Sequence, residues 1–163
     1  MEDFVRLFST NKGDVYHITL SEDASLLSEE VKAFIGSTKL IGIDLRRLAG
    51  ENITTQGMLA ALENTIADFF MKHDDVMIFY YCDFLNPIPH TTKNAMPPQE
   101  YRSRLFENLF KRYTKLHSVR NIYLSVITVK GIGETYYFHL IYRDIHAKFA
   151  PIISQDIKDG LGK

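Results

Sequence analysis

The apolar run VMIFYYC at residues 76–82 leaves no position for a polar face, which is typical of a strand buried on both sides. We therefore expect residues 76–83 to form the centre of a sheet, with the carboxylate of Asp83 placed where the strand meets solvent. The proline-containing segment that follows, residues 84–98, is long for a connection inside a compact domain. A segment of this kind is either functional or mobile.

Two pairs of alternating segments predict hairpins. Residues 4–9 and 15–20 flank TNKGD, whose Asn and Gly tolerate the positive φ angles of a tight reversal. Residues 121–130 and 135–143 flank GIGE, which predicts a second hairpin near the end of the chain.

Apolar positions spaced three or four residues apart predict helices. These positions occur in residues 27–35, 55–72, 99–117 and 145–157. In the last of these segments we expect Pro151 to interrupt the helix early and the final residues GLGK to fray. The apolar run at residues 39–48 is interpreted as a strand, and the helix after it is long enough to return the chain parallel to that strand.

Together these elements predict a single α+β domain over residues 1–163. Its mixed central sheet has about six strands, made of two hairpins plus two strands linked by crossover helices, and three to four helices pack on it. With 163 residues, of which 45% are hydrophobic and 24% charged, the chain is large enough to bury such a core.

Composition also indicates a compartment. The one cysteine, Cys82, cannot form an internal disulfide, which favours a reducing environment. The first ten residues lack the apolar core of a signal peptide, and no apolar run approaches the ~20 residues that span a bilayer. We expect a cytoplasmic protein with no membrane segment.

The net charge of −1 conceals an asymmetry between the two parts of the chain. Residues 1–98 hold 8 Lys and Arg against 14 Asp and Glu, whereas residues 99–163 hold 11 against 6. A basic half can bind an anionic partner, but two oppositely charged halves can also attract each other within one fold or between subunits. We favour the second interpretation, because the overall charge gives no field that steers nucleic acid toward the protein.

Asp44 and Asp83 are the first candidates for a site. Each is predicted to lie at or near the end of a parallel strand, and ligands of open α/β sheets bind at that edge. Two carboxylates there could hold Mg²⁺ and, with cations from the following helix, cleave a phosphodiester. The alternative, which we favour, is structural: such an Asp caps a turn or pairs with an arginine such as Arg46, Arg47 or Arg102.

The helix predicted at residues 99–117 is cationic, and residues 99–120 carry a net charge of +4. The cations expected mainly to face solvent are Arg102, Arg104, Lys111, Arg112 and Lys115, with Arg120 following the helix. Such a face can track phosphates, or it can be a solvated complement to the acidic half, which we favour. His90, on the segment 84–98, is a candidate ligand contact because loops often carry function.

The chain contains no His/Cys spacing typical of a zinc site and no Walker, GxGxxG or GxSxG motif. We therefore predict no resident metal or cofactor, and leave open whether the protein is an enzyme. Cys82 is expected to be a buried thiol of the central strand.

At YYCDF and RSRLFENLFKRY the chain resembles a bacterial family of small uncharacterised proteins. In that family an aromatic strand ends in Cys-Asp, and the next helix reads Arg-x-Arg-x-Phe. The residues that match this pattern here are Cys82, Asp83, Arg102, Arg104 and Phe106. The resemblance implies no activity, because the family's function is unknown.

From these patterns we predict a non-enzymatic module inside the cell. It would bind a protein partner or a second copy of itself through the basic helix and the segment 84–98. Two alternatives stay open: a Mg²⁺-dependent nuclease or phosphohydrolase that uses Asp44 and Asp83, and a nucleic-acid-binding regulator that uses the helix 99–117.

Overall fold

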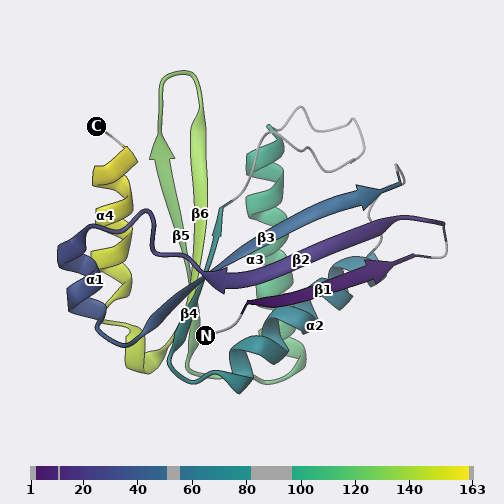
Figure 1. Ribbon diagram of the computed structural model, residues 1–163, viewed down its shortest axis with the longest axis horizontal. Helices are drawn as coiled ribbons and strands as arrows, with labels where there is room; N and C mark the ends of the chain where they lie inside the picture. The colour runs from purple at the N-terminus through teal and green to yellow at the C-terminus, as the bar shows by residue number, and fades with distance from the viewer. Residues whose placement is uncertain (1–2, 11, 51–55, 82–96, 162–163) are drawn as a thin grey trace.

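A six-stranded sheet runs through the molecule, and four α-helices and one short 3-10 helix pack around it in the described part of the chain (Figure 1). The computed structural model describes residues 3–10, 12–50, 56–81 and 97–161. In chain order the elements are β1 (Phe4–Ser9), β2 (Val15–Glu22), α1 (Glu29–Ile35), β3 (Lys39–Ala49), α2 (Gln56–Lys72), β4 (Val76–Tyr81), α3 (Pro98–Leu116), β5 (Ile122–Lys130), β6 (Thr135–Arg143), the 3-10 helix η1 (Asp144–His146) and α4 (Ala150–Leu161).

The strands lie in the order β1-β2-β3-β4-β6-β5. β1, β2 and β3 form an antiparallel meander, β3 and β4 are parallel, and β6 pairs antiparallel with both β4 and β5. Helix α2 connects the two parallel strands, and α3 carries the chain past β6 to the far edge at β5. The predicted α+β domain, with a mixed six-stranded sheet, two hairpins and crossover helices, is confirmed.

β4 occupies the middle of this sheet, between β3 and β6. All of its residues except the last are buried. Met77 and Phe79 belong to the core on one face of the sheet, whereas Val76 and Ile78 belong to the core on the other. The prediction of a central strand buried on both sides is therefore confirmed for residues 76–81, and the predicted last two residues lie outside the described ranges.

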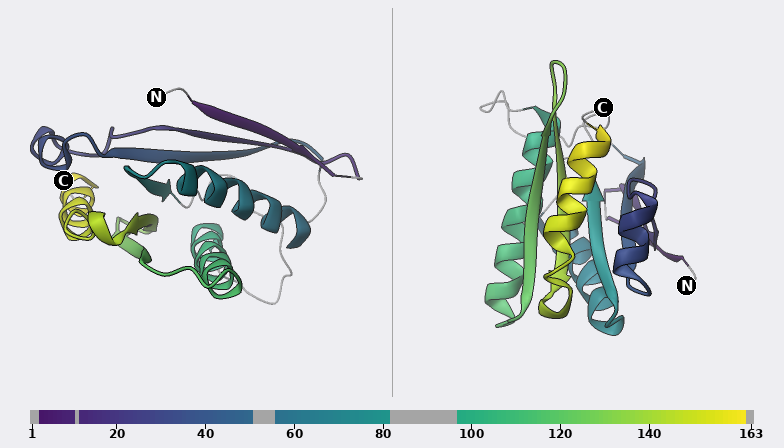
Figure 2. Two further views of the ribbon diagram at one scale, coloured as in Figure 1. Left: turned by 90° about the horizontal axis from the view of Figure 1, so that it is seen from below. Right: turned by 90° about the vertical axis from the view of Figure 1, so that its left-hand side faces the viewer.

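Helices cover both faces of the twisted sheet (Figure 2). α1 and α4 pack on one face, where Val31 and Ile153 belong to the same core as Met77. α2 packs on the other face, where Phe69 belongs to the same core as Ile78, and α3 lies beside α2. Within the described ranges, none of these helices is long and apolar enough to cross a membrane.

The C-terminal helix differs from our expectation. Pro151 is the second residue of α4, and in the first turn of a helix the missing N–H of proline has no intrahelical partner to lose. Pro151 therefore begins this helix and does not interrupt it. The helix also continues to Leu161, past the expected end, because Ile153 and Ile157 lie one turn apart and are both buried in the core.

A polar junction fixes the beginning of β4. Oδ1 of Asp75 accepts a hydrogen bond from Oγ1 of Thr38 at 2.7 Å and lies 3.0 Å from Nε2 of His146. The hydrogen bond from Thr38, and after it the one from His146, lowers the pKa of Asp75. Because Thr38 precedes β3 and His146 lies in η1, this carboxylate joins the start of the parallel pair to the segment that leads into α4.

Burial on both faces predicts that truncation of β4 is costly on either side. We expect Met77→Ala and Ile78→Ala each to lower the free energy of unfolding by about 2–5 kcal/mol, since each leaves a cavity in a different core. Urea denaturation followed by circular dichroism measures both. The matched control is Val126→Ala in the edge strand β5, where the side chain is exposed and the loss should stay near 0.5 kcal/mol or below. A cost as small as the control's at either position would contradict two-sided burial.

Candidate functional site

The structure describes one member of the predicted carboxylate pair. Asp44 is exposed, and its Oδ2 lies 2.9 Å from Nε of Arg46. This ion pair is the structural role that we favoured for the residue. Asp83, His90 and Cys82 lie outside the described residues, so the magnesium site stays a prediction. In the part of the chain that the structure describes, no three His, Cys, Asp or Glu side chains gather closely enough to hold a metal ion.

The position of Asp44 along its strand corrects a second expectation. Parallel pairing with β4 ends at Gly42, but β3 continues to Ala49 as the partner of β2. Asp44 therefore lies within β3, opposite Thr19 of β2, and not at a strand end. The alternating pattern of β3 could not show where one of its two partners stops.

The two arginines that we placed together lie in different environments. Arg104 is exposed, and its Nη2 donates to Oε1 of Glu100 at 3.0 Å. Arg102 is only 7% exposed, and its Nε has no hydrogen-bond partner among the described residues. The expectation that both face solvent is wrong for Arg102, because it lies one helical turn before Phe106, which packs on the core of the sheet.

The exposed cations of α3 are partly neutralised along the helix itself. Arg104 pairs with Glu100, and Nζ of Lys111 lies 3.1 Å from Oε1 of Glu107, each pair one helical turn apart. Exposed pairs of this kind contribute only about 0.3–0.5 kcal/mol to stability. They do reduce the positive field that a polyanion would meet, and binding of nucleic acid by this helix stays a prediction.

Polar side chains that we did not predict as a group meet beneath the first two turns of α3. Gln99, Arg102 and Ser103 are buried there. Oγ of Ser103 and Nε2 of His139, in β6, are joined by a hydrogen bond of 2.8 Å. Nε2 of Gln99 donates to the carbonyl of Thr135, also in β6, at 3.3 Å. These bonds attach the beginning of α3 to the sheet.

Ser103 and His139 have the composition of a nucleophile and its base. Burial, however, lowers the pKa of His139 to about 4, against an opposing effect of Glu107. Ser103 is 4% exposed and His139 1%, and no described residue bonds Nδ1 of His139 to orient the ring. We interpret the pair as structural, a neutral imidazole that holds α3 against β6.

The helical spacing of α3 predicts one half of the Ser103–His139 contact, the burial of Ser103. Ser103 lies three residues before Phe106 and seven before Phe110, on the side of the apolar stripe. A polar residue on such a stripe is expected to be buried with a partner. The sequence does not identify the partner, because His139 is 36 positions away on another element.

A different feature lies at the β1 edge of the sheet. Among the described residues β1 pairs with β2 alone, and its sequence FVRLFS has neither of the residues, Lys and Pro, that commonly protect an edge. Val5 and Leu7 are 54% and 60% exposed and alternate along β1 with Phe4 and Phe8, which pack against the core that contains Phe69 of α2, so they lie on the face turned away from α2. Leu48 of β3 is 58% exposed and lies on the same face, because it follows two residues after Arg46, which pairs with His17 opposite Leu7. β1 thus combines unpaired backbone groups with exposed apolar side chains.

Burial of His139 predicts a pH dependence of stability. Its folded-state pKa of about 4 lies below the ordinary value of 6.5, so the unfolded chain binds the proton first. The contribution is complete above about pH 6.5 and is lost as the pH falls toward 4, by roughly 3 kcal/mol in total. We expect His139→Gln, which keeps a hydrogen-bonding group but does not titrate, to remove this part of the slope. Urea denaturation at several pH values from 4.5 to 7.5 measures it, and equal slopes for the two proteins would contradict the burial of a neutral imidazole.

Comparison with known proteins adds no assignment. No protein-family model matches the chain. No curated protein matches it either. The resemblance of its Cys-Asp and Arg-x-Arg-x-Phe motifs to a bacterial family of uncharacterised proteins therefore stays a prediction, and function has to be argued from the geometry alone.

Proposed function

We propose that the protein is a non-enzymatic, self-associating module whose β1 pairs antiparallel with β1 of a second copy. The observation that carries this proposal is the edge of β1, which among the described residues pairs with β2 alone and has Val5 and Leu7 exposed beside it. An added strand satisfies the outward-facing N–H and C=O groups of an edge, which water otherwise occupies. Two identical edges meet about a two-fold axis, the commonest symmetry of homodimers.

The sequence of β1 favours one register for this contact. Residues that lie opposite each other in an antiparallel pair share a face, so the two-fold axis passes through a residue. An axis at Arg6 would place two guanidinium groups opposite each other, which is unfavourable. An axis at Leu7 places Leu7 against Leu7 of the second copy, Val5 against its Ser9, and Arg6 against its Phe8.

The Arg6–Phe8 contact in this register repeats an interaction that one chain already makes. The guanidinium carbon of Arg6 lies 5.1 Å from the centroid of the Phe8 ring in the same strand. In the dimer each Arg6 would therefore stand between two aromatic rings, which favours the cation. The Leu7-centred register gains apolar and cation–π contacts and places no like charges opposite each other.

The surface that we propose differs from the one expected from the sequence. The basic helix directs several cations to solvent, but Arg104 and Lys111 are engaged by acids one turn away. The segment 84–98, the other expected surface, lies largely outside the described residues. Self-association itself, which the charge asymmetry also favoured, is kept.

Leu7→Lys tests the dimer. The substitution places two ammonium groups opposite each other at the axis, yet it leaves the folded chain intact because the side chain is 60% exposed. Repulsion and the lost apolar contact together amount to about 1–2 kcal/mol, which weakens dimerisation roughly tenfold. Light scattering after size exclusion should give about twice the 18.8 kDa of one chain for the natural sequence and a lower average mass for the variant.

Leu48→Lys is the matched control. Leu48 is almost equally exposed on the same face, but it lies on β3, two strands away from the edge. We expect this variant to keep the dimer mass. Loss of the dimer in both variants would assign the contact to the open face and not to the edge, and a monomer for the natural sequence at ~100 μM would reject the proposal.

The register has its own test in a Cys82→Ser background. Leu7→Cys should form an intermolecular disulfide under mild oxidation, because position 7 meets itself at the axis. Arg6→Cys meets Phe8 of the second copy and should not. Non-reducing electrophoresis distinguishes the two, and the reverse result would place the axis at residue 6.

A further inference from the structure

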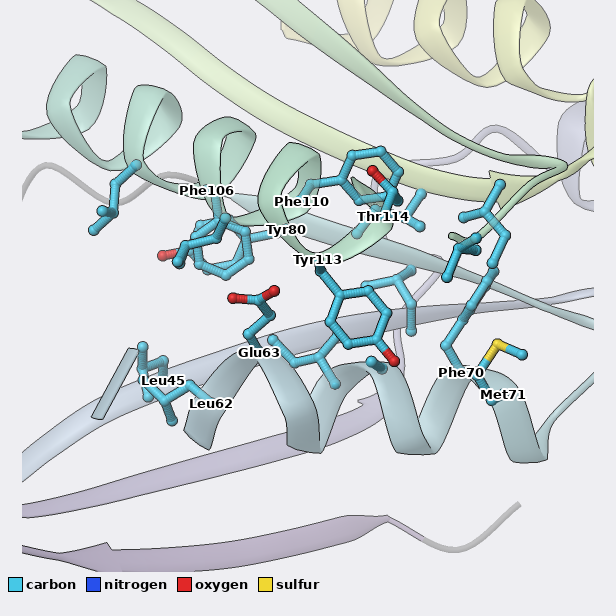
Figure 3. A pocket seen from close by; sticks show the side chains of 18 residues that line it. Leu45, Leu62, Glu63, Phe70, Met71, Tyr80, Phe106, Phe110, Tyr113 and Thr114 are labelled. Carbon is cyan, nitrogen blue, oxygen red and sulfur yellow. The ribbon is translucent and has the colours of Figure 1, made fainter. Parts of the chain in front are cut away.

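An apolar cleft lies between α2 and α3, on the face of the sheet opposite to α1 and α4 (Figure 3). Leu62 and Ile66 of α2 form one wall, Phe106 and Phe110 of α3 form the other, and Ile78 of β4 lies on the floor. The cleft has a volume of about 90 Å³. It opens to solvent, as the half-exposed aromatic side chains of α3 show.

The cleft exists because the apolar stripe of α3 is incompletely covered. Gln99 and Ser103 in the first turns of the helix are buried, but Phe106, Phe110 and Tyr113 are only half-buried. A helix of this pattern ordinarily buries its stripe against the fold. Side chains that border such an apolar space lose dispersion contacts on that side, and an apolar molecule placed in the space restores them.

One charged side chain lines the cleft. Figure 3 shows the carboxylate of Glu63 projecting from α2 into the gap, with the ring of Tyr113 beside it. Burial raises the pKa of Glu63, whereas the nearby charges of Arg112 and His117 lower it and so favour the ionised form. Neither Arg112 nor His117 lines the cleft.

The Glu63 carboxylate makes no hydrogen bond or ion pair with another described residue, and no cation of these residues lies within 4 Å of it. A partly desolvated carboxylate without a partner attracts a cation more strongly than one in water. Aromatic rings beside it, here Tyr113 and Phe106, add attraction for a cation over their faces.

We propose that the cleft between α2 and α3 binds a small organic amine, with its apolar body between the helices and its ammonium group at the carboxylate of Glu63. The volume limits the body to about four carbon atoms, by comparison with an apolar cavity of about 150 Å³ that accepts benzene. A carboxylate or phosphate ligand is disfavoured, because the charge that it would meet at this position is negative. This site is independent of the β1 edge and adds to the proposed function.

Three ligands with closely similar apolar bodies test the charge. Isobutylamine, 2-methylpropan-1-ol and 2-methylpropanoate, each with four carbon atoms, carry a positive, a neutral and a negative head group. In titrations of the ¹⁵N-labelled full chain followed by NMR we expect the amine to bind about tenfold more tightly than the alcohol, and the carboxylate more weakly than both. The largest shifts should occur at amides of α2 and α3 around residues 63 and 113.

Three variants test whether the ammonium group binds at Glu63 and whether the ligand occupies the cleft. Glu63→Gln should lower the affinity for the amine about tenfold, to that of the alcohol, and leave the alcohol unchanged, which also shows that the cleft is intact. Asp68→Asn is the matched control, since Asp68 is an exposed acid of the same helix that does not line the cleft. Ala67→Leu, which fills the cleft from α2, should abolish binding of amine and alcohol alike.

Several results would overturn the proposal. Equal affinities for amine and alcohol would leave only an apolar cleft without a role for the carboxylate. An equal loss of affinity for the amine in the Asp68 and Glu63 variants would show that the negative field of the helix, and not a specific contact with Glu63, attracts the amine. Absence of shifts with isobutylamine up to 50 mM, or binding that persists in Ala67→Leu, would remove the site altogether.

Discussion

The fold depends on the burial of β4 from both sides. A strand with consecutive apolar residues must be covered on each face, so the chain has to place helices on both sides of one sheet. It does so with α2 and α3 on one side and α1 and α4 on the other, and the β3–α2–β4 crossover brings the first of these helices into place. Met77 and Ile78, adjacent in sequence, belong to different cores for this reason. The polar junction at Asp75 then fixes where the strand begins.

The sequence predicts most of this architecture because the signals are local. Alternating apolar and polar positions predict the two hairpins, apolar positions three or four residues apart predict the helices, and the unbroken apolar run predicts β4. Pro151 misled us because a proline inside an apolar pattern indicates a break, whereas in the first turn it is compatible with the helix. The position of Asp44 within β3 was hard to predict for another reason. Pairing of β3 with β4 ends at Gly42, whereas pairing with β2 continues to Ala49, and the residue pattern of one strand does not show which strands pair with it.

Sites were harder to predict than elements. Asp44 has the ion pair with an arginine that we weighed as an alternative, whereas the pair of Arg104 with Glu100 was not anticipated. Asp83 and His90 lie outside the described residues. Arg102 and Ser103 are buried because they lie on the face of α3 that is turned toward the sheet. The helical period of about 3.6 residues could have predicted this position from the sequence. The partner of Ser103 could not be found in this way, because the contact with His139 joins distant elements. The sequence could not predict the cleft beside α2. The apolar stripe of α3 has the same sequence pattern whether the fold buries it fully or only in part.

The hydrogen bond between Ser103 and His139 also determines how α3 can move. It fixes the helix near its beginning, together with the bond from Gln99 to Thr135, while Leu116 at the other end is exposed. Because the helix is held at its beginning, a molecule bound between α3 and α2 would displace the end at Leu116 more than the beginning. A small widening of the cleft near Phe110 would then produce a larger displacement of the helix end at Leu116.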